Sequence, residues 1–161
     1  MAASDENLKQ ILPILSAQTI GFDKLNQLRH VRYFENADNI RAHMQKLAEK
    51  LRPKFDLTHS ILERDLTPYG IAHWTRPLGG YFISLFLLPG TAKRTWTLCK
   101  EAGVTMTNVG ATYPYRLDPD DSNIRIAPTY PSLENLEAAM CILTLCARIA
   151  ALEKLTGEAD A

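Results

Sequence analysis

One long apolar stripe constrains the fold of this chain more than any other feature of its sequence. Starting at Ile40, apolar residues recur at steps of three and four, the spacing that gathers side chains on one face of an α-helix. The stripe comprises Ile40, Met44, Leu47, Leu51, Phe55, Thr58 and Leu62. Asn36 or Asp38 can cap this helix, which we expect to reach about Leu66. Because Pro53 removes a backbone donor at a cost of about 3 kcal/mol, we expect a kink just before it. A long kinked helix predicts a connector between two regions.

Two shorter helices are expected before the stripe. Residues 7–17 favour a helix that Pro13 must bend or end. A turn follows at residues 19–23, and residues 24–34 again carry apolar side chains at helical spacing.

After Thr67 the pattern becomes that of a small sheet with helices. Strands are expected at residues 71–75, 81–87, 104–108 and 124–127. Thr91 is expected to cap a helix that runs to about Ala102 and ends at Gly103. Ser132 is expected to cap a final helix. Its apolar face contains Leu133, Leu136, Met140, Leu143 and Ala147. This order predicts an α+β fold, a small antiparallel or mixed sheet covered by helices.

The composition is that of an ordinary globular domain. The chain has 161 residues, 46% of them hydrophobic and 22% charged, and a formal net charge of zero. A neutral chain offers no electrostatic support for binding nucleic acid or an anionic membrane. The first residues are acidic, and the longest apolar run, residues 81–88, is too short to span a bilayer, so neither a signal peptide nor a membrane partner is expected. Three cysteines without CxxC spacing are typical of reduced thiols in the cytoplasm.

Familiar catalytic motifs do not occur in the sequence. It has no Walker A motif, no GxGxxG and no nucleophile elbow, and its four histidines lack metal-ligand spacing. We therefore expect no metal site, and a structural or surface role for each histidine.

Three stretches favour a more specific role. Residues 74–82 contain Gly79-Gly80, which allow a positive φ or a close backbone approach, with a plain hairpin turn as the alternative. In residues 122–132, Arg125 lies between two isoleucines in a short strand, where a partly desolvated guanidinium suits a carboxylate. A surface salt bridge is the alternative there. Residues 23–32 are locally basic, and a solvated helix face is the alternative.

These stretches carry a resemblance to a known family. Residues 74–84, WTRPLGGYFIS, resemble the W-x-x-P-x-G-G-Y-F segment of fold-type I pyridoxal-phosphate (PLP) aminotransferases. Residues 123–134, NIRIAPTYPSLE, resemble their R-(apolar)-A-x-S-x-P-S-x-E-E-L segment, in the same order and at a similar separation. Residues 19–30 resemble a bacterial subgroup of aspartate aminotransferases. The resemblance covers about residues 3–155.

The resemblance implies roles for a few residues. Arg125 matches the arginine that grips the α-carboxylate of the amino-acid or 2-oxo-acid substrate. Gly79 and Gly80 match the turn that starts a strand of the small domain, and Tyr81 and Phe82 would pack beneath the site rather than react. The segment containing Asn26 and Arg29 matches a region near the dimer interface, from which either side chain would reach the edge of the neighbouring site.

The chain departs from the family in its cofactor residues. The family's Schiff-base lysine, its pyridine-nitrogen aspartate and most of its phosphate cup lie upstream of the matched region. We therefore expect no catalytic or cofactor-binding residue in this chain, no bound PLP and no activity of the chain alone, although the complete enzyme would use PLP.

The resemblance also implies a domain organisation. Residues 1–36 would be a remnant of the large PLP-binding domain, residues 37–66 the interdomain helix, and residues 67–161 the small C-terminal domain that closes over substrate as a mobile lid. The complete enzyme would be a homodimer that transfers an amino group between an amino acid, aspartate or glutamate, and a 2-oxo acid. The alternative is a non-catalytic module, derived from such a small domain, that binds carboxylates or a partner protein.

Overall fold

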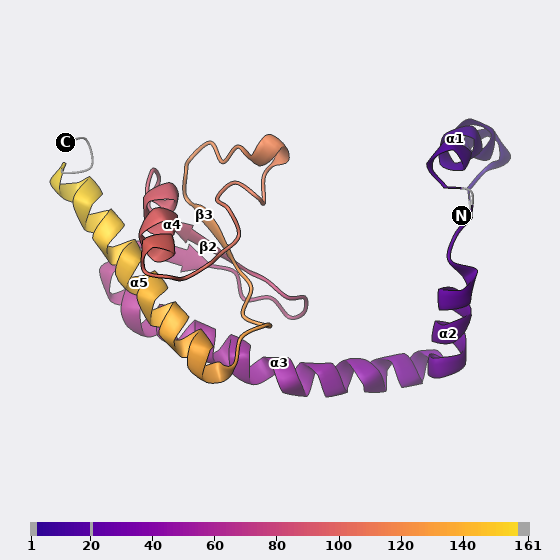
Figure 1. Cartoon of the computed structure of the whole chain (residues 1–161), viewed down its shortest axis with the longest axis horizontal. Coiled ribbons are helices and arrows are strands. Elements are labelled where there is room, and N and C mark those ends of the chain that lie inside the picture. Colours follow the sequence, from indigo (N-terminus) through magenta and orange to yellow (C-terminus); the bar gives the residue numbers. More distant parts are fainter. Residues whose placement is uncertain (1–2, 20, 158–161) are drawn as a thin grey trace. The chain divides into compact units, whose positions relative to one another are not determined.

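The computed structural model describes residues 3–19 and 21–157, and its contacts divide the chain into two units, residues 1–47 and 48–161. The division falls inside helix α3 (Ala37–Leu66), which continues from one unit into the other (Figure 1). The domain limits expected from the sequence, at residues 36 and 66, stay a prediction.

The first unit consists of helices with side-chain caps and no buried core. It contains α1 (Asp5–Gln18), α2 (Lys24–Phe34) and the start of α3. The carboxylate of Asp23 caps α2, and the side chain of Asn36, one of the two expected caps, accepts the first N–H groups of α3. His43 of α3 packs edge-on against aromatic rings of α2. Neither α1 nor α2 has a buried residue, so their apolar side chains have no core to enter within this unit.

Prolines interrupt neither of the two helices that contain them. Pro13 was expected to bend or end a helix over residues 7–17, but α1 runs through Pro13 as one helix to Gln18. α3 likewise runs through Pro53 as one continuous helix. A proline removes one helical hydrogen bond, to the carbonyl four residues earlier. Those carbonyls belong to the exposed residues Lys9 and Glu49, where water can replace the missing donor.

The second unit contains a three-stranded antiparallel sheet. Its strands are β1 (Ala72–Trp74), β2 (Ile83–Leu87) and β3 (Asn123–Ile126), in the order β1-β2-β3. In the register of β2 with β3, Ser84 lies opposite Arg125 and Leu85 opposite Ile124. The antiparallel form of the predicted sheet is therefore the observed one.

Helices cover one face of this sheet. They are the C-terminal half of α3, α4 (Ala92–Glu101) and α5 (Leu133–Thr156), and short 3₁₀ turns occur at Thr67–Tyr69 and Pro114–Arg116. The core combines alternate residues of the strands with one face of each helix. Its fully buried members include Ile61, Leu62, Leu66, Ile83, Leu85, Cys99, Ile124, Leu136, Met140 and Leu143. The α+β class expected from the sequence is confirmed.

One expectation about local structure in this unit was wrong, and another was right in position only. Residues 104–108 form no strand: after Gly103, at φ +87°, the N–H of Val104 bonds back to the carbonyl of Cys99, and the segment continues in irregular form. Thr91 occupies the N-cap position of α4, as expected, but its side chain does not accept from the helix, because its hydroxyl donates to the carbonyl of Leu88. Asp121 takes that role from a distant loop. Its carbonyl accepts from Thr91 and Ala92, and its carboxylate accepts from the N–H of Lys93.

The last helix lies where it was predicted, and it carries apolar residues beyond its one expected face. Ser132 caps α5, as expected, by accepting from the N–H of Asn135. Within the described residues, α5 is the one helix long and apolar enough to cross a membrane by length and composition. Its apolar face, including Met140, Leu143 and Ala147, is buried against the rest of the unit, and this packing accounts for part of the composition.

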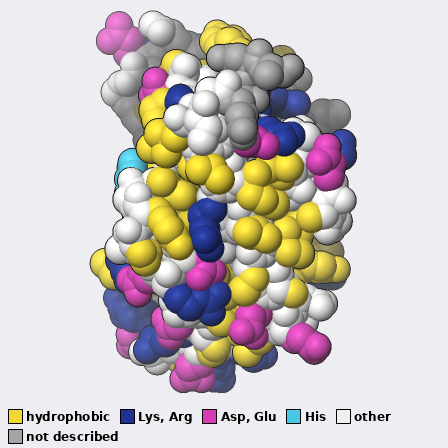
Figure 2. Space-filling model, turned by 90° about the vertical axis from the view of Figure 1, so that its left-hand side faces the viewer, with side chains coloured by type: hydrophobic (Ala, Val, Ile, Leu, Met, Phe, Trp, Pro, Cys, Tyr) yellow, Lys and Arg dark blue, Asp and Glu magenta, His cyan; other side chains and the backbone are white. Residues whose placement is uncertain are grey.

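Apolar side chains also lie on the outer side of α5. Leu145, Ile149, Leu152 and Leu155 are exposed and, with Tyr69 and Ile71, line a shallow groove of about 360 Å³. Arg148 stacks on Tyr69 within this groove, its guanidinium carbon 4.6 Å from the ring centroid. Figure 2 shows hydrophobic side chains gathered on this side of the molecule.

Candidate functional site

Arg125 extends from the face of the sheet that the helices leave uncovered. Its neighbours in β3, Ile124 and Ile126, are buried in the core. Because successive side chains of a strand point to opposite faces, Arg125 lies on the other face, beside Ser84 of β2. The strand that anchors the core thus also places one guanidinium at the sheet surface.

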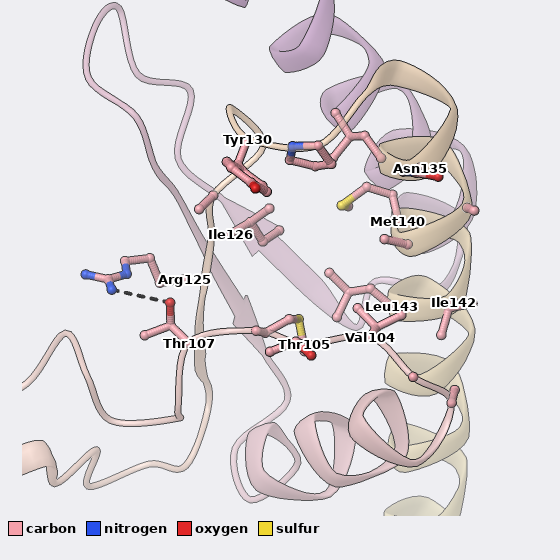
Figure 3. A pocket seen from close by; sticks show the side chains of 18 residues that line it. Val104, Thr105, Thr107, Arg125, Ile126, Tyr130, Asn135, Met140, Ile142 and Leu143 are labelled. Carbon is pink, nitrogen blue, oxygen red and sulfur yellow. Dashed lines mark hydrogen bonds between the residues drawn. The ribbon is translucent and has the colours of Figure 1, made fainter.

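Two side chains hold that guanidinium. The ring of Phe82, just before β2, lies under it, with 4.5 Å between the ring centroid and Cζ. Nη2 donates to the hydroxyl of Thr107 at 3.3 Å (Figure 3). Nε is buried and has no acceptor among the described residues. Among the described residues no carboxylate forms an ion pair with Arg125, so the salt bridge considered from the sequence is not formed. Donors of a half-buried cation therefore remain free for an anion.

An apolar cavity of about 530 Å³ lies beside β3, and Arg125 and Thr107 are among the residues that line it. Residues 102–107, the end of β3 and the first turns of α5 form its walls, which include Ile126, Met140 and Leu143. Figure 3 shows the Arg125 side chain pointing away from this space and toward Thr107. Arg125 therefore contributes to the wall of this cavity, while its guanidinium points away from the cavity.

A buried amide fixes β3 next to Arg125. Asn123 is 2% exposed, and its amide donates to the hydroxyl of Ser84 at 2.8 Å while its carbonyl accepts from Thr112 at 2.7 Å. The carboxylate of Asp118 accepts from the backbone N–H groups of Ser122 and Asn123, both at 2.8 Å. Satisfied buried networks of this kind rigidify their surroundings. They hold β3 against β2 at the position of Arg125.

A lysine holds the connection that follows β3. The ammonium of Lys54, on α3, donates to the carbonyls of Thr129 and Pro131 at 2.7 and 2.6 Å. Both carbonyls lie just before the start of α5, so Lys54 ties α3 to the β3–α5 loop.

The glycine pair lies in the β1–β2 loop, which reaches into solvent. Gly80 has φ +92°, whereas Gly79 has no positive φ. A Cβ added at either glycine would meet nothing within 4 Å, so the positive φ of Gly80, not a close backbone approach, explains a glycine here. Nearby, Arg76 pairs with Glu63 of α3.

Asn26 and Arg29 lie exposed on α2, in the first unit. Asn26 uses its backbone N–H to bond the Asp23 carboxylate and its carbonyl to bond His30. Their expected role at the edge of a neighbouring site stays a prediction.

Other reactive groups in the described residues are few or inert. No group of three or more His, Cys, Asp or Glu side chains could hold a metal there. Burial next to Cys146 raises the pKa of Cys99 to about 12, so this thiol stays protonated at neutral pH.

Sequence reasoning singled out Arg125 but missed Thr107. Residues 104–108 were read as a strand, and nothing local marks a threonine there as a partner of an arginine 18 residues later. The contact follows from how the segment after α4 returns along β3.

Comparison with known proteins assigns the family. The sequence model of the family described as "Aspartate amino-transferase" matches residues 1–159. The chain is 49% identical to an aminotransferase of Mycolicibacterium smegmatis over 98% of its own length and 37% of that protein. It is 47% identical to an aspartate aminotransferase of Corynebacterium glutamicum over 93% of its length and 35% of that protein. A crystal structure of an aspartate transaminase from Corynebacterium glutamicum superimposes with a TM-score of 0.86 at 47% identity, over 94% of this chain and 36% of the other.

The chain spans little more than a third of the length of these relatives. The chain belongs to the aspartate aminotransferase family.

Proposed function

We propose that the complete protein transfers an amino group between an amino acid, aspartate or glutamate, and a 2-oxo acid, with PLP as its cofactor and as a homodimer in the cytoplasm. The observation that carries this proposal is the half-buried guanidinium of Arg125, which has free donors and no carboxylate partner in the described residues. The relatives named as aspartate aminotransferases support the choice of substrates.

Arg125 binds the α-carboxylate that all amino acids and 2-oxo acids share. A guanidinium presents two parallel donors to the two oxygens of a carboxylate, so it fixes both the position and the orientation of the substrate. Orientation matters because holding the reacting atom in place contributes much of the rate gain of such a reaction.

The described residues do not by themselves fit PLP. In this family the cofactor's electron-accepting ring supplies the chemistry and requires a lysine at the site. No described lysine lines either cavity, and the ammonium of Lys54 is bonded to two backbone carbonyls. We infer that the remaining two thirds of the enzyme hold the cofactor, and that this chain supplies the carboxylate clamp and the mobile lid and is inactive alone.

Joining the two parts of the enzyme tests this proposal. This chain is fused to the preceding part of the Corynebacterium glutamicum aspartate aminotransferase. We expect the fusion to bind PLP, seen by its absorbance, and to transaminate aspartate with 2-oxoglutarate. The isolated chain, mixed with PLP and dialysed, should retain none.

Two controls make the result decisive. The Corynebacterium glutamicum part alone should be inactive, so that any activity of the fusion requires this chain. Stoichiometric PLP on one lysine of the isolated chain would contradict the proposal. So would a folded, PLP-loaded fusion without transaminase activity.

The isolated chain should also self-associate in solution. Leu12, Ile14, Leu25 and Val31 are exposed in the first unit, and large apolar patches drive association. Light scattering over a wide concentration range should give a mass that rises with concentration. The control is the variant with Leu25 and Val31 both replaced by Gln, which should shift the curve toward monomer. A clean monomer at all concentrations would refute the expectation.

A further inference from the structure

We propose that Phe82 and Thr107 are positioning residues that set the direction of the Arg125 donors before substrate arrives. This inference rests on the proposed function, because it takes the Arg125 guanidinium as the carboxylate clamp. It adds two residues to which neither the family match nor the sequence motifs give this role.

A free arginine side chain is a poor clamp because it is flexible. Ordering its long stem on binding consumes part of the binding free energy, and fixing it in advance avoids that loss. Contacts within the chain hold Arg125 at two points, one on the face of its guanidinium and one on its edge.

Phe82 fixes the plane of the guanidinium. Its ring lies 4.5 Å from Cζ, a cation–π contact, and covers one face. Phe82 is itself 47% exposed, but the next residue, Ile83, is fully buried and begins β2. The ring therefore projects from a rigid point of the sheet, although it belongs to a solvent-exposed loop.

Thr107 fixes the rotation of the guanidinium within that plane. Its hydroxyl oxygen accepts one Nη2 hydrogen at 3.3 Å. A hydroxyl that accepts this bond keeps its own hydrogen, which can donate to an anion placed beside Nη2.

The remaining donors then point to one place. Nε is buried, one face is covered and one Nη2 hydrogen is used. Nη1 and the second Nη2 hydrogen have no partner among the described residues. A carboxylate is expected to bind at these donors, with the Thr107 hydroxyl as an additional donor.

The first arm of the test needs no substrate. In the 161-residue chain, nuclear magnetic resonance measures how fast the guanidinium of each arginine rotates about its Cζ–Nη bonds. We expect slow rotation for Arg125 and fast rotation for the exposed Arg52. Phe82→Leu and Thr107→Val should each speed the Arg125 rotation roughly three- to tenfold, from the strength of a cation–π contact or hydrogen bond. Equal rates for Arg125 and Arg52 in the unmodified chain would overturn the proposal.

The second arm uses the fused enzyme. Phe82→Leu and Thr107→Val should each raise KM for aspartate roughly tenfold and leave the PLP absorbance unchanged. Phe82→Tyr and Thr107→Ser, which keep the ring and the hydroxyl, should restore most of the loss. The matched controls are Thr105→Val, two residues from Thr107, and Leu78→Ala, in the same loop as Phe82; both should leave KM unchanged.

The outcomes separate this inference from the proposed function. If Arg125→Ala cripples the enzyme while Phe82→Leu and Thr107→Val leave KM unchanged, the clamp stands and the positioning role is wrong. If Arg125→Ala itself has no effect, the proposed function fails. A variant that unfolds is recognised by its lowered thermal midpoint. The conservative variants Phe82→Tyr and Thr107→Ser then decide the question. They support the proposal if they keep slow Arg125 rotation and a normal KM, and they contradict it if they lose both.

Discussion

Replacing Arg125 by alanine in the fused enzyme should lower kcat/KM for aspartate by roughly two to three decades. Losing a charged hydrogen-bonding partner from a desolvated site costs about 2–5 kcal/mol. Arg125→Lys should recover part of the loss, because a point charge attracts the carboxylate but cannot reproduce the two parallel donors. Steady-state kinetics with aspartate and 2-oxoglutarate measure both effects.

Arg76 is the matched control for this prediction. It lies on the same β1–β2 connection as Phe82, but its guanidinium pairs with Glu63 at an exposed position. Exposed ion pairs contribute little, so Arg76→Ala should change kcat/KM far less. The PLP absorbance should be the same in all three variants. If Arg125→Ala kept near-normal kinetics while Arg76→Ala lost most of its activity, Arg76 and not Arg125 would be the residue that binds the substrate carboxylate.

Replacing Leu85 by alanine should cause the largest loss of stability among single core changes in β2, about 2–5 kcal/mol. Leu85 is fully buried at the centre of the sheet, opposite both Trp74 and Ile124. Truncating it removes apolar contacts and leaves a cavity that close-packed neighbours cannot fill. Urea unfolding followed by tryptophan fluorescence measures the change, since Trp74 reports on the same layer.

Leu78 provides the comparison within the same residue type. It is fully exposed at the tip of the β1–β2 loop, so Leu78→Ala removes no buried area. Its free energy of unfolding should stay within about 0.5 kcal/mol of that of the unmodified chain, as for other surface substitutions. A similar loss for both leucines would mean that the β1–β2 loop is part of a packed interface in solution.

The elements that sequence reasoning located correctly are those with a local signal. The stripe from Ile40 to Leu62 lies in α3, and its C-terminal members Thr58 and Leu62 are buried. Ser132 begins α5, and the alternation around Leu85 marks a buried strand. In each case periodicity or a capping residue is a direct consequence of the geometry of one element.

The incorrect or missed predictions concern contacts between residues that are far apart in the sequence. Asp121 caps α4 from a loop 28 residues from Lys93, so no pattern near Thr91 could show it. The same holds for Thr107 and Arg125. Sequence reasoning therefore named Arg125 and placed Phe82 near it, but Thr107, the hydrogen-bond partner of Arg125, emerged only with the tertiary structure.

The alternation along β3 has a consequence for insertions and deletions. Ile124 and Ile126 enter the core from one face while Arg125 lies on the other, in a register that pairs Arg125 with Ser84. A slip of one residue would turn every side chain of the strand to the opposite face. It would bury a guanidinium and expose two isoleucines at once. Natural variation in the length of the loop from residue 108 to 121 is therefore tolerable only where Asp118 still bonds Ser122 and Asn123, because these bonds set the residue at which the strand begins.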